Sequence, residues 1–308
     1  MIPHGTSTIG SAWFLNGLAN LQQQQIETQR QLSSGYQVRD ASDSPSQAQE
    51  LVTLGSTLAS AQTYQTSLGS VQAEAQLADT ALDTGISLAG RARSLAAQGA
   101  NTATTAAERL ALASEVQGIQ EHLVALANST SAGRYIFGGD QDQTAPYRFN
   151  SASASGADSL SPAASTRLIV NPVGQTVFQS LSATAIFNPA DLAGVPLAGN
   201  IFVALQSLRT ALLANDQAGT ANAISLLKTS SDYLIRQQAY YGSSEQRITS
   251  EQDDAANQVT ALRVEIGRIR DADVVKAATD LTQENTSQQA ALGAQAAIPR
   301  KSLFDYLG

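Results

Sequence analysis

Apolar or small residues recur along most of the chain at alternating intervals of three and four, which places them on one stripe of an α-helix. Near the N-terminus this stripe contains Phe14, Leu18 and Leu21, but it continues through the polar residues Gln25 and Thr28. A helix with so narrow an apolar face gains little stability by itself. Residues 1–44 therefore predict an assembly helix, followed by a turn, that needs a partner helix.

The next stripe is longer and more apolar. It begins at Leu51 and reaches about Gly99, which predicts one long helix, and a turn rich in Thr and Ala follows it. The same spacing resumes from Leu112 to Leu126. Two helices joined by a short turn pack antiparallel, so residues 45–132 predict a long helical hairpin.

The pattern changes in the middle of the chain, where Gly, Pro, Ser and β-branched residues replace the helical spacing. The segments TRLIVNP and QTVFQSL are typical of short strands bounded by turns. Residues 133–200 therefore predict a β-rich outer domain. Helical spacing returns over residues 201–241, with a loop at 215–219, and predicts a helical return segment.

The most regular stripe lies near the C-terminus and runs from Ile248 to Asp273 without a break, which predicts one C-terminal assembly helix within residues 242–308. The first and last segments each lack a partner nearby in sequence, so we expect them to pair with each other. The fold class that follows is mainly α, with long coiled-coil helices from both termini packed together and a small β-rich central insertion domain.

The expected seam between the terminal segments contains polar residues, namely Gln25, Thr28, Gln252 and Asp273. Apolar burial contributes ~25 cal/mol per Å², whereas ordering the backbone costs ~1 to 2 kcal/mol per residue. Such a seam hardly offsets that cost. We therefore expect the termini to be weakly ordered in a monomer and to fold on assembly.

The amino-acid composition argues against several classes of binding partner. The net charge is −8 and the chain has three lysines, so it lacks the basic surface that nucleic acid or anionic lipid requires. The N-terminal apolar stretch has no basic region before it and contains Gly and Asn, so neither a cleaved signal peptide nor membrane insertion is expected. The chain has no cysteine and two distant histidines, and we expect no metal site and no cofactor.

Two polar segments could be mistaken for catalytic or ligand sites. In RQLSSGYQVRDASDSPSQAQ (30–49), Gly35 suits a left-handed helix cap and Pro45 the first position of the next helix. A nucleophile there would lack a nearby His or Lys base. GRYIFGGDQD (133–142) lacks the residues of a phosphate loop or an EF-hand, which favours a turn. No catalytic residue is predicted, and the chain is interpreted as a protein without enzymatic activity.

The termini carry segments with a recognisable pattern. LSSGYQVRDASDSPSQAQ (32–49) resembles a stretch near the N-terminus of bacterial flagellins, and RIRDADVVKAATDLT (268–282) resembles a run near their C-terminus, with GSSEQRI (242–248) before it. NSTSAGRYIFGGDQDQTAPY (128–147) and the ending SLFDYLG are similar to the hook-filament junction proteins of that family. The chain departs from the family pattern where Asp43 is followed by Ser44.

The resemblance implies a structural subunit of the bacterial flagellum that is exported by the flagellar type III system and lies outside the cell at the hook-filament junction. The implied partners are hook-associated protein 1, flagellin, copies of the chain in a ring, and a flagellar export chaperone. Flagellin itself, the filament subunit, stays open as an alternative. So does an enzyme or ligand-binding module within residues 140–196, although this range contains no His, Cys or Lys.

We expect the assembly contacts on the terminal stripes and within the two family segments. Asp271 and Asp273 are two residues apart on the expected helix, so they face different sides and favour an interface over a carboxylate pair. GRARSLAAQGAN (90–101) is similar to the flagellin segment that innate immune receptors recognise, and Arg91 and Leu95 match its pattern. The expected assembly residues are Phe14, Leu18, Leu21, Gly35, Arg39, Asp43, Val259, Leu262, Ile266, Ile269, Asp271 and Asp273.

Overall fold

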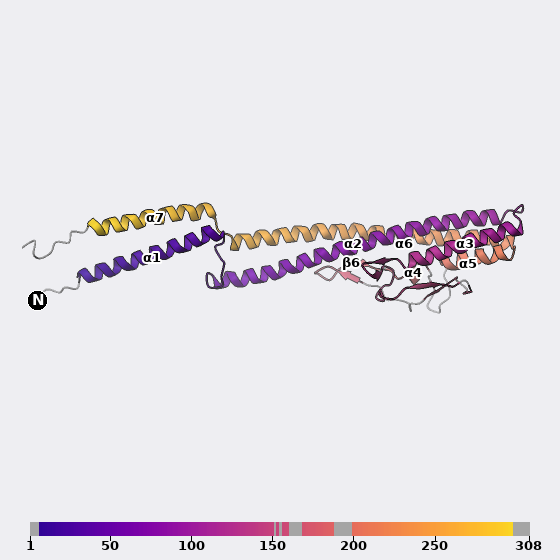
Figure 1. The fold of residues 1–308 in the computed structure, drawn as a ribbon, viewed down its shortest axis with the longest axis horizontal. Helices are drawn as coiled ribbons and strands as arrows, with labels where there is room; N and C mark the ends of the chain where they lie inside the picture. Colours follow the sequence, from indigo (N-terminus) through magenta and orange to yellow (C-terminus); the bar gives the residue numbers. More distant parts are fainter. Residues whose placement is uncertain (1–5, 151, 154–155, 160–167, 188–198, 298–308) are drawn as a thin grey trace, which may run out of the picture. The chain divides into compact units, whose positions relative to one another are not determined.

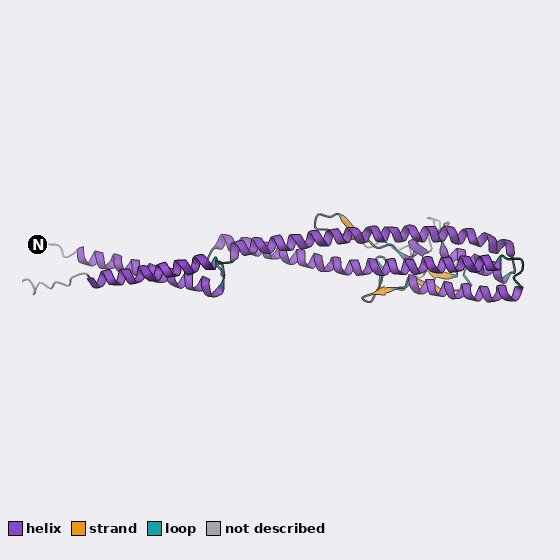
Figure 2. Cartoon of the chain, turned by 90° about the horizontal axis from the view of Figure 1, so that it is seen from above, coloured by secondary structure: helices purple, strands orange, loops and turns teal. Residues whose placement is uncertain are grey.

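The computed structural model describes residues 6–150, 152–153, 156–159, 168–187 and 199–297. Helices dominate this part of the chain and the strands are short, so the predicted fold class is confirmed (Figure 2). The helices are α1 (Thr6–Ser34), α2 (Pro45–Gly99), α3 (Ala106–Ala127), α4 (Ala183–Phe187), α5 (Ile201–Leu213), α6 (Gln217–Arg270) and α7 (Val274–Ala297). The strands are β1 (Thr130–Ser131), β2 (Arg134–Tyr135), β3 (Tyr147–Phe149), β4 (Ala157–Ser159), β5 (Leu168–Val170) and β6 (Thr176–Gln179).

The chain divides into two compact units, one formed by residues 62–256 and the other by residues 1–61 and 257–308. The larger unit contains the main hydrophobic core, to which α2, α3, α5 and α6 contribute (Figure 1). The core residues of these helices are mostly Leu and Ala, and small side chains allow helices to approach closely. Because many of these side chains are small, the helices pack closely and the core between them is thin.

Helices α2 and α3 follow each other across a short turn and contact each other through polar groups. Thr105 and Glu108 make a capping box that starts α3, and Arg91 of α2 pairs with Glu115 of α3 at 2.6 Å. The buried Arg109 guanidinium donates hydrogen bonds to the Gly99 carbonyl at 2.8 Å and to the Asn215 side chain. Arg109 therefore joins the turn after α2 to the turn before α6.

The β-rich part consists, among the described residues, of three two-stranded antiparallel sheets, β1-β2, β3-β4 and β5-β6. The segments predicted as strands pair with each other as β5 and β6. The turn predicted within 133–142 is confirmed, because Gly133 adopts a φ of +77° between β1 and β2. Phe137 of the same segment is buried and packs edge-on against Phe187 at 5.4 Å.

The prediction of one unbroken C-terminal helix through Asp273 is wrong. Helix α6 runs from Gln217 through the predicted 241/242 boundary and ends at Arg270, and α7 begins at Val274. The Asp273 carboxylate accepts the N–H groups of Val275 and Lys276, both at 3.0 Å, as an N-terminal cap does. Asp271 and Asp273 therefore lie in a connection between two helices instead of on a helix.

The pairing of the chain ends is confirmed, with α7 as the partner of α1 (Figure 1). Gln25 donates to Asn285 at 2.6 Å, and Thr28 donates to Glu284 at 3.0 Å, so these two polar residues lie on the seam as predicted. Gln252 does not, because its side chain bonds Gln72 of α2 at 2.9 Å. The regular stripe from Ile248 thus belongs to α6 and not to the terminal helix pair.

Phe14, Leu18 and Leu21 are half-buried on α1. His4 and the ending SLFDYLG lie outside the described residues. No helix of the described ranges is both long enough and apolar enough to cross a membrane.

Candidate assembly site

The two segments that carry the family pattern are adjacent in space. The Ala272 N–H donates to the Gly35 carbonyl at 2.8 Å, and the N–H groups of Gln37 and Val38 donate to the Arg270 carbonyl at 2.8 and 3.3 Å. Tyr36 and Asp271 form an antiparallel bridge. We call this region, Gly35–Asp43 with Gly267–Asp273, the motif junction. It fixes the end of α1 against the break between α6 and α7.

Gly35 ends α1 in the conformation predicted for it. Its φ is +74°, and its N–H donates to the Gln31 carbonyl at 2.8 Å. A residue with a side chain adopts this left-handed conformation at a cost, whereas glycine does so freely. Glycine therefore allows the chain to reverse and to present the Gly35 carbonyl to Ala272.

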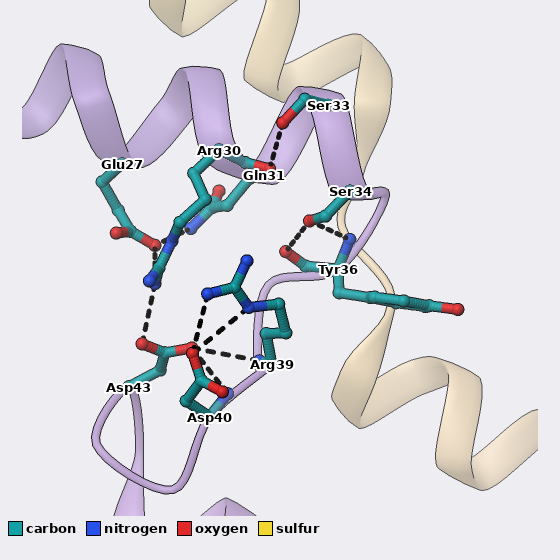
Figure 3. A network of polar contacts seen from close by, with 9 residues as sticks. All are labelled: Glu27, Arg30, Gln31, Ser33, Ser34, Tyr36, Arg39, Asp40 and Asp43. Carbon is teal, nitrogen blue, oxygen red and sulfur yellow. Dashed lines mark hydrogen bonds and ion pairs between the residues drawn. The ribbon is translucent and has the colours of Figure 1, made fainter.

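Asp43 organises the turn that follows (Figure 3). One carboxylate oxygen accepts the N–H groups of Arg39 and Asp40, both at 3.0 Å, and the other accepts the Arg30 guanidinium at 2.7 Å. The Asp40 N–H, the Arg30 guanidinium and the Arg39 N–H, in this order, lower the pKa of Asp43 from 3.8 to about 2. Asp43 is thus ionised throughout the physiological range and holds the loop against α1.

A second set of contacts joins the loop after α1 to the C-terminal end of α6 through residues that sequence reasoning missed. The Arg270 guanidinium lies 4.4 Å from the centre of the Tyr36 ring, and its Nε donates to the Asp271 carboxylate at 3.0 Å. The Gln37 side chain donates to the Ile269 carbonyl at 2.8 Å. The available sequence signal was an aromatic residue beside a helix-capping glycine, which by itself does not indicate its partner.

The Arg39 side chain takes no part in the contacts with Tyr36 and Asp43 and is exposed to solvent. Its side chain pairs with Asp40 at 2.9 Å and both side chains are about half exposed, so the pair contributes little to stability. The loop therefore offers a charged surface around Arg39, while its backbone is fixed by Asp43.

The expected residues on α6 are partly used within the chain. Val259 and Ile269 are buried, and Leu262 and Ile266 are half-buried. These side chains are therefore at least partly covered by other residues of the same chain, and a role for them in assembly stays a prediction.

A second stripe on α1, which sequence reasoning missed, remains uncovered. Leu15, Ala19, Gln22 and Ile26 follow spacings of four, three and four, and all four are exposed. Leu15 is 61% exposed and Ile26 66%. We call these four residues the outer stripe of α1. On α7, Val275 and Leu292 are likewise exposed.

The segment that resembles a receptor-binding region lies in the larger unit. Arg91 is exposed and paired with Glu115, as described above, whereas Leu95 is fully buried in the core. A receptor could contact Arg91 on this surface but not the Leu95 side chain. Recognition stays a prediction, and it depends on Arg91.

Among the residues that the structure describes, no three His, Cys, Asp or Glu side chains gather in an arrangement that could hold a metal ion. The geometry of the motif junction is that of a fixed connection between helices. Its hydrogen bonds are made to main-chain groups and to charged neighbours within the chain, which suits a structural role.

Comparison with known proteins agrees with this architecture. The family models for the bacterial flagellin N-terminal and C-terminal helical regions match residues 9–142 and 224–307. Flagellar hook-associated protein 3 of Escherichia coli is 27% identical over 220 residues, which are 69% of this chain and 68% of that protein.

Two solved structures share the fold. FlgL from Bacillus cereus has a TM-score of 0.55 and 20% identity, and the match covers 70% of this chain and 99% of that one. Flagellar hook-associated protein 3 from Legionella pneumophila has a TM-score of 0.59 and 12% identity, with 70% and 98% covered. The two family matches together span more than half of the chain and include both sides of the motif junction. The chain belongs to the bacterial flagellin family.

Proposed function

We propose that this chain is a structural subunit of the bacterial flagellum that connects the hook to the filament, with no enzymatic activity. The observation that carries the proposal is the terminal helix pair, which exposes Leu15 and Ile26 on α1 and Val275 and Leu292 on α7 and is fixed at the motif junction. The similarity to hook-associated protein 3 favours a junction subunit over flagellin.

The contacts within the helix pair explain why it needs neighbours. The seam contains exposed or half-buried polar contacts such as Gln25 to Asn285 and Thr28 to Glu284, and such bonds contribute about 0.5 to 1.5 kcal/mol each. Fully burying a Leu or Ile side chain contributes about 1.5 to 3 kcal/mol, and Leu15 and Ile26, which are 61% and 66% exposed, would gain about 1 to 2 kcal/mol each. Leu15 and Ile26 therefore stand to gain more from a neighbouring helix than the seam gains from its polar bonds.

The occupants of this surface would be the terminal helices of copies in a ring, with hook-associated protein 1 on one side and flagellin on the other. The family resemblance supports these partners, export through the flagellar type III system, and an export chaperone. Weak order of α1 and α7 before assembly would assist export, because a chain that unfolds easily passes a narrow channel at lower cost.

Deletion of the gene tests the proposal. We expect the deletion strain to keep its hooks, to lose its filaments and to release flagellin into the medium, and we expect the wild-type gene to restore the filaments. If the chain were flagellin itself, no flagellin would appear in the medium. A deletion strain that kept attached filaments would contradict the proposal.

A further inference from the structure

The β5-β6 hairpin lies in the larger unit (Figure 1). Val177 and Phe178 of β6 are buried, and the Tyr240 hydroxyl donates to the Gln179 carbonyl at 2.9 Å. At its turn, Asn171 accepts the Gln175 N–H at 2.9 Å and donates to Glu251 at 3.2 Å. The hairpin is therefore held in one position on the helices.

Glu251 also ties this attachment to α2, since its other carboxylate oxygen accepts the Tyr64 hydroxyl at 3.0 Å. Burial and this hydrogen bond raise the pKa of Tyr64, so the phenol keeps its proton and remains a donor. The turn of the hairpin is thus bonded to both α2 and α6.

The outer side of β5 is apolar, whereas the β6 residues paired with it on this side, Gln179 and Thr176, are polar. Leu168 is 53% exposed, Val170 48% and Val173 78%, while Ile169 between them packs against the core. A strand with one face in water ordinarily places polar residues on that face. An aliphatic outer face on a fixed hairpin therefore indicates a surface that is covered in the functional state.

This apolar face continues into a polar hollow. Val170 pairs with Thr176 across the hairpin, and paired residues project to the same side of a sheet. Thr176 in turn lines a cavity of about 320 Å³ together with Ser243, Arg247 and Ser250 of α6. The surface thus combines aliphatic side chains with hydroxyl and amide groups, the Arg247 guanidinium group and the Glu251 carboxylate, a mixture typical of a protein contact.

We propose that this outer hairpin face, defined as Leu168, Val170 and Val173, is a lateral contact between neighbouring copies of the chain in the assembled ring. The inference rests on the proposed function, which places copies side by side. It identifies a contact outside the terminal helices, made by the β-rich part.

The small area of the face indicates what kind of partner can bind it. A stable interface between free proteins buries about 800 Å² on each partner, and three partly exposed aliphatic side chains provide only a fraction of that area. Such a face binds a partner that other contacts already hold nearby, because tethering raises the effective concentration to the millimolar range. A neighbouring copy held by its terminal helices meets this requirement.

The geometry of a ring adds a further condition. Contacts around a ring are heterologous, so the hairpin face meets a different surface of the next copy and not the same hairpin.

The absence of cysteine in the sequence permits a direct test. The variant Val173→Cys carries a single thiol, and a maleimide-benzophenone probe is attached to it in the purified protein before the labelled protein is added to hooks of the deletion strain for assembly. Irradiation then links the probe to whatever lies beside Val173, and mass spectrometry identifies that protein. We expect the main product to join two copies of this chain, and we expect no such product from the soluble purified protein.

The matched control is Val170→Asp in the Val173→Cys background, which alters the neighbouring exposed position and should leave the circular dichroism spectrum unchanged. We expect the yield of linked copies to fall at least fivefold. Linkage to flagellin or another protein, an unchanged yield in the control, or no product in assembled flagella would each overturn the contact. Failure of the proposed function would look different, namely a deletion strain that keeps its filaments.

Discussion

Replacement of Gly35 by alanine tests whether the motif junction depends on the left-handed turn. An ideal Cβ at Gly35 would meet no atom within 4 Å, so the substitution creates no clash. The cost is therefore the conformational cost of a side chain at a φ of +74°, about 1 to 2 kcal/mol. That cost raises the population of the open junction about 5-fold to 30-fold.

Amide hydrogen exchange on the soluble protein, with millisecond labelling, measures this opening directly. The relevant amides are those of Ala272, which donates to the Gly35 carbonyl, and of Gln37, which donates to the Arg270 carbonyl. Both should exchange about 5 to 30 times faster in Gly35→Ala. In Gly35→Asn the increase should be smaller, because asparagine tolerates the left-handed conformation better than alanine.

Gly17 provides a matched control on the same helix. Its Cβ would also meet nothing within 4 Å, but Gly17 lies inside α1. Gly17→Ala should stabilise α1 by about 0.5 to 1 kcal/mol and leave exchange at Ala272 no faster. If both variants changed exchange at Ala272 equally, or if Gly35→Ala left it unchanged, the reasoning about the junction would be refuted.

Three further predictions concern other parts of the chain. The pKa of Asp43 is lowered on folding from 3.8 to about 2, so its stabilising effect is complete above about pH 4 and is lost as the pH falls towards 2. Amide hydrogen exchange in the turn should therefore become faster over this acid range, and Asp43→Asn should remove this pH dependence. Leu15→Asp and Ile26→Asp should abolish filament attachment without changing the thermal midpoint of the larger unit, and normal filaments in both would contradict a covered outer stripe. Arg109→Lys should lower the free energy of unfolding by about 2 kcal/mol, or the thermal midpoint of the larger unit by about 4 to 8 °C, because a buried lysine cannot satisfy the same acceptors. Arg91→Lys, at an exposed ion pair, is the control and should change the free energy of unfolding by under about 0.5 kcal/mol.

The helices were predictable because helical periodicity is a local property. The stripe from Leu51 identified α2, and Gly35 was recognised as a cap from its position after an apolar pattern. The strands β5 and β6 followed from β-branched residues between turn formers. None of these features depends on a distant part of the chain.

The break between α6 and α7 was missed because periodicity does not stop there. The spacing of four and three continues through Ile269 to Asp273. The Ala272 N–H nevertheless donates to the carbonyl of Gly35, a residue far away in sequence, and not to a carbonyl of α6. The local signal was Asp273 before Val274, since aspartate is a favoured N-terminal cap. Here a cap together with a distant acceptor outweighed the helical pattern.

The sequence indicated the segments that form the motif junction but not the contacts between them. The two family segments indicated where to look, whereas the interaction of Arg270 with Tyr36 and the acceptors of Asp43 depend on how the chain returns. The outer stripe of α1 was missed because Leu15 and Ile26 stand among polar residues and outside the first stripe. Burial of Leu95 likewise follows from packing that one helix does not reveal.

The central claim is that this chain occupies a short zone between hook and filament. Immunogold electron microscopy of intact flagella, with an antibody against the β-rich part, locates the chain directly. Our account predicts gold particles confined to the boundary between hook and filament, at one zone per flagellum. Labelling along the whole filament would instead identify a filament subunit, and unlabelled junctions on flagella with attached filaments would contradict the account.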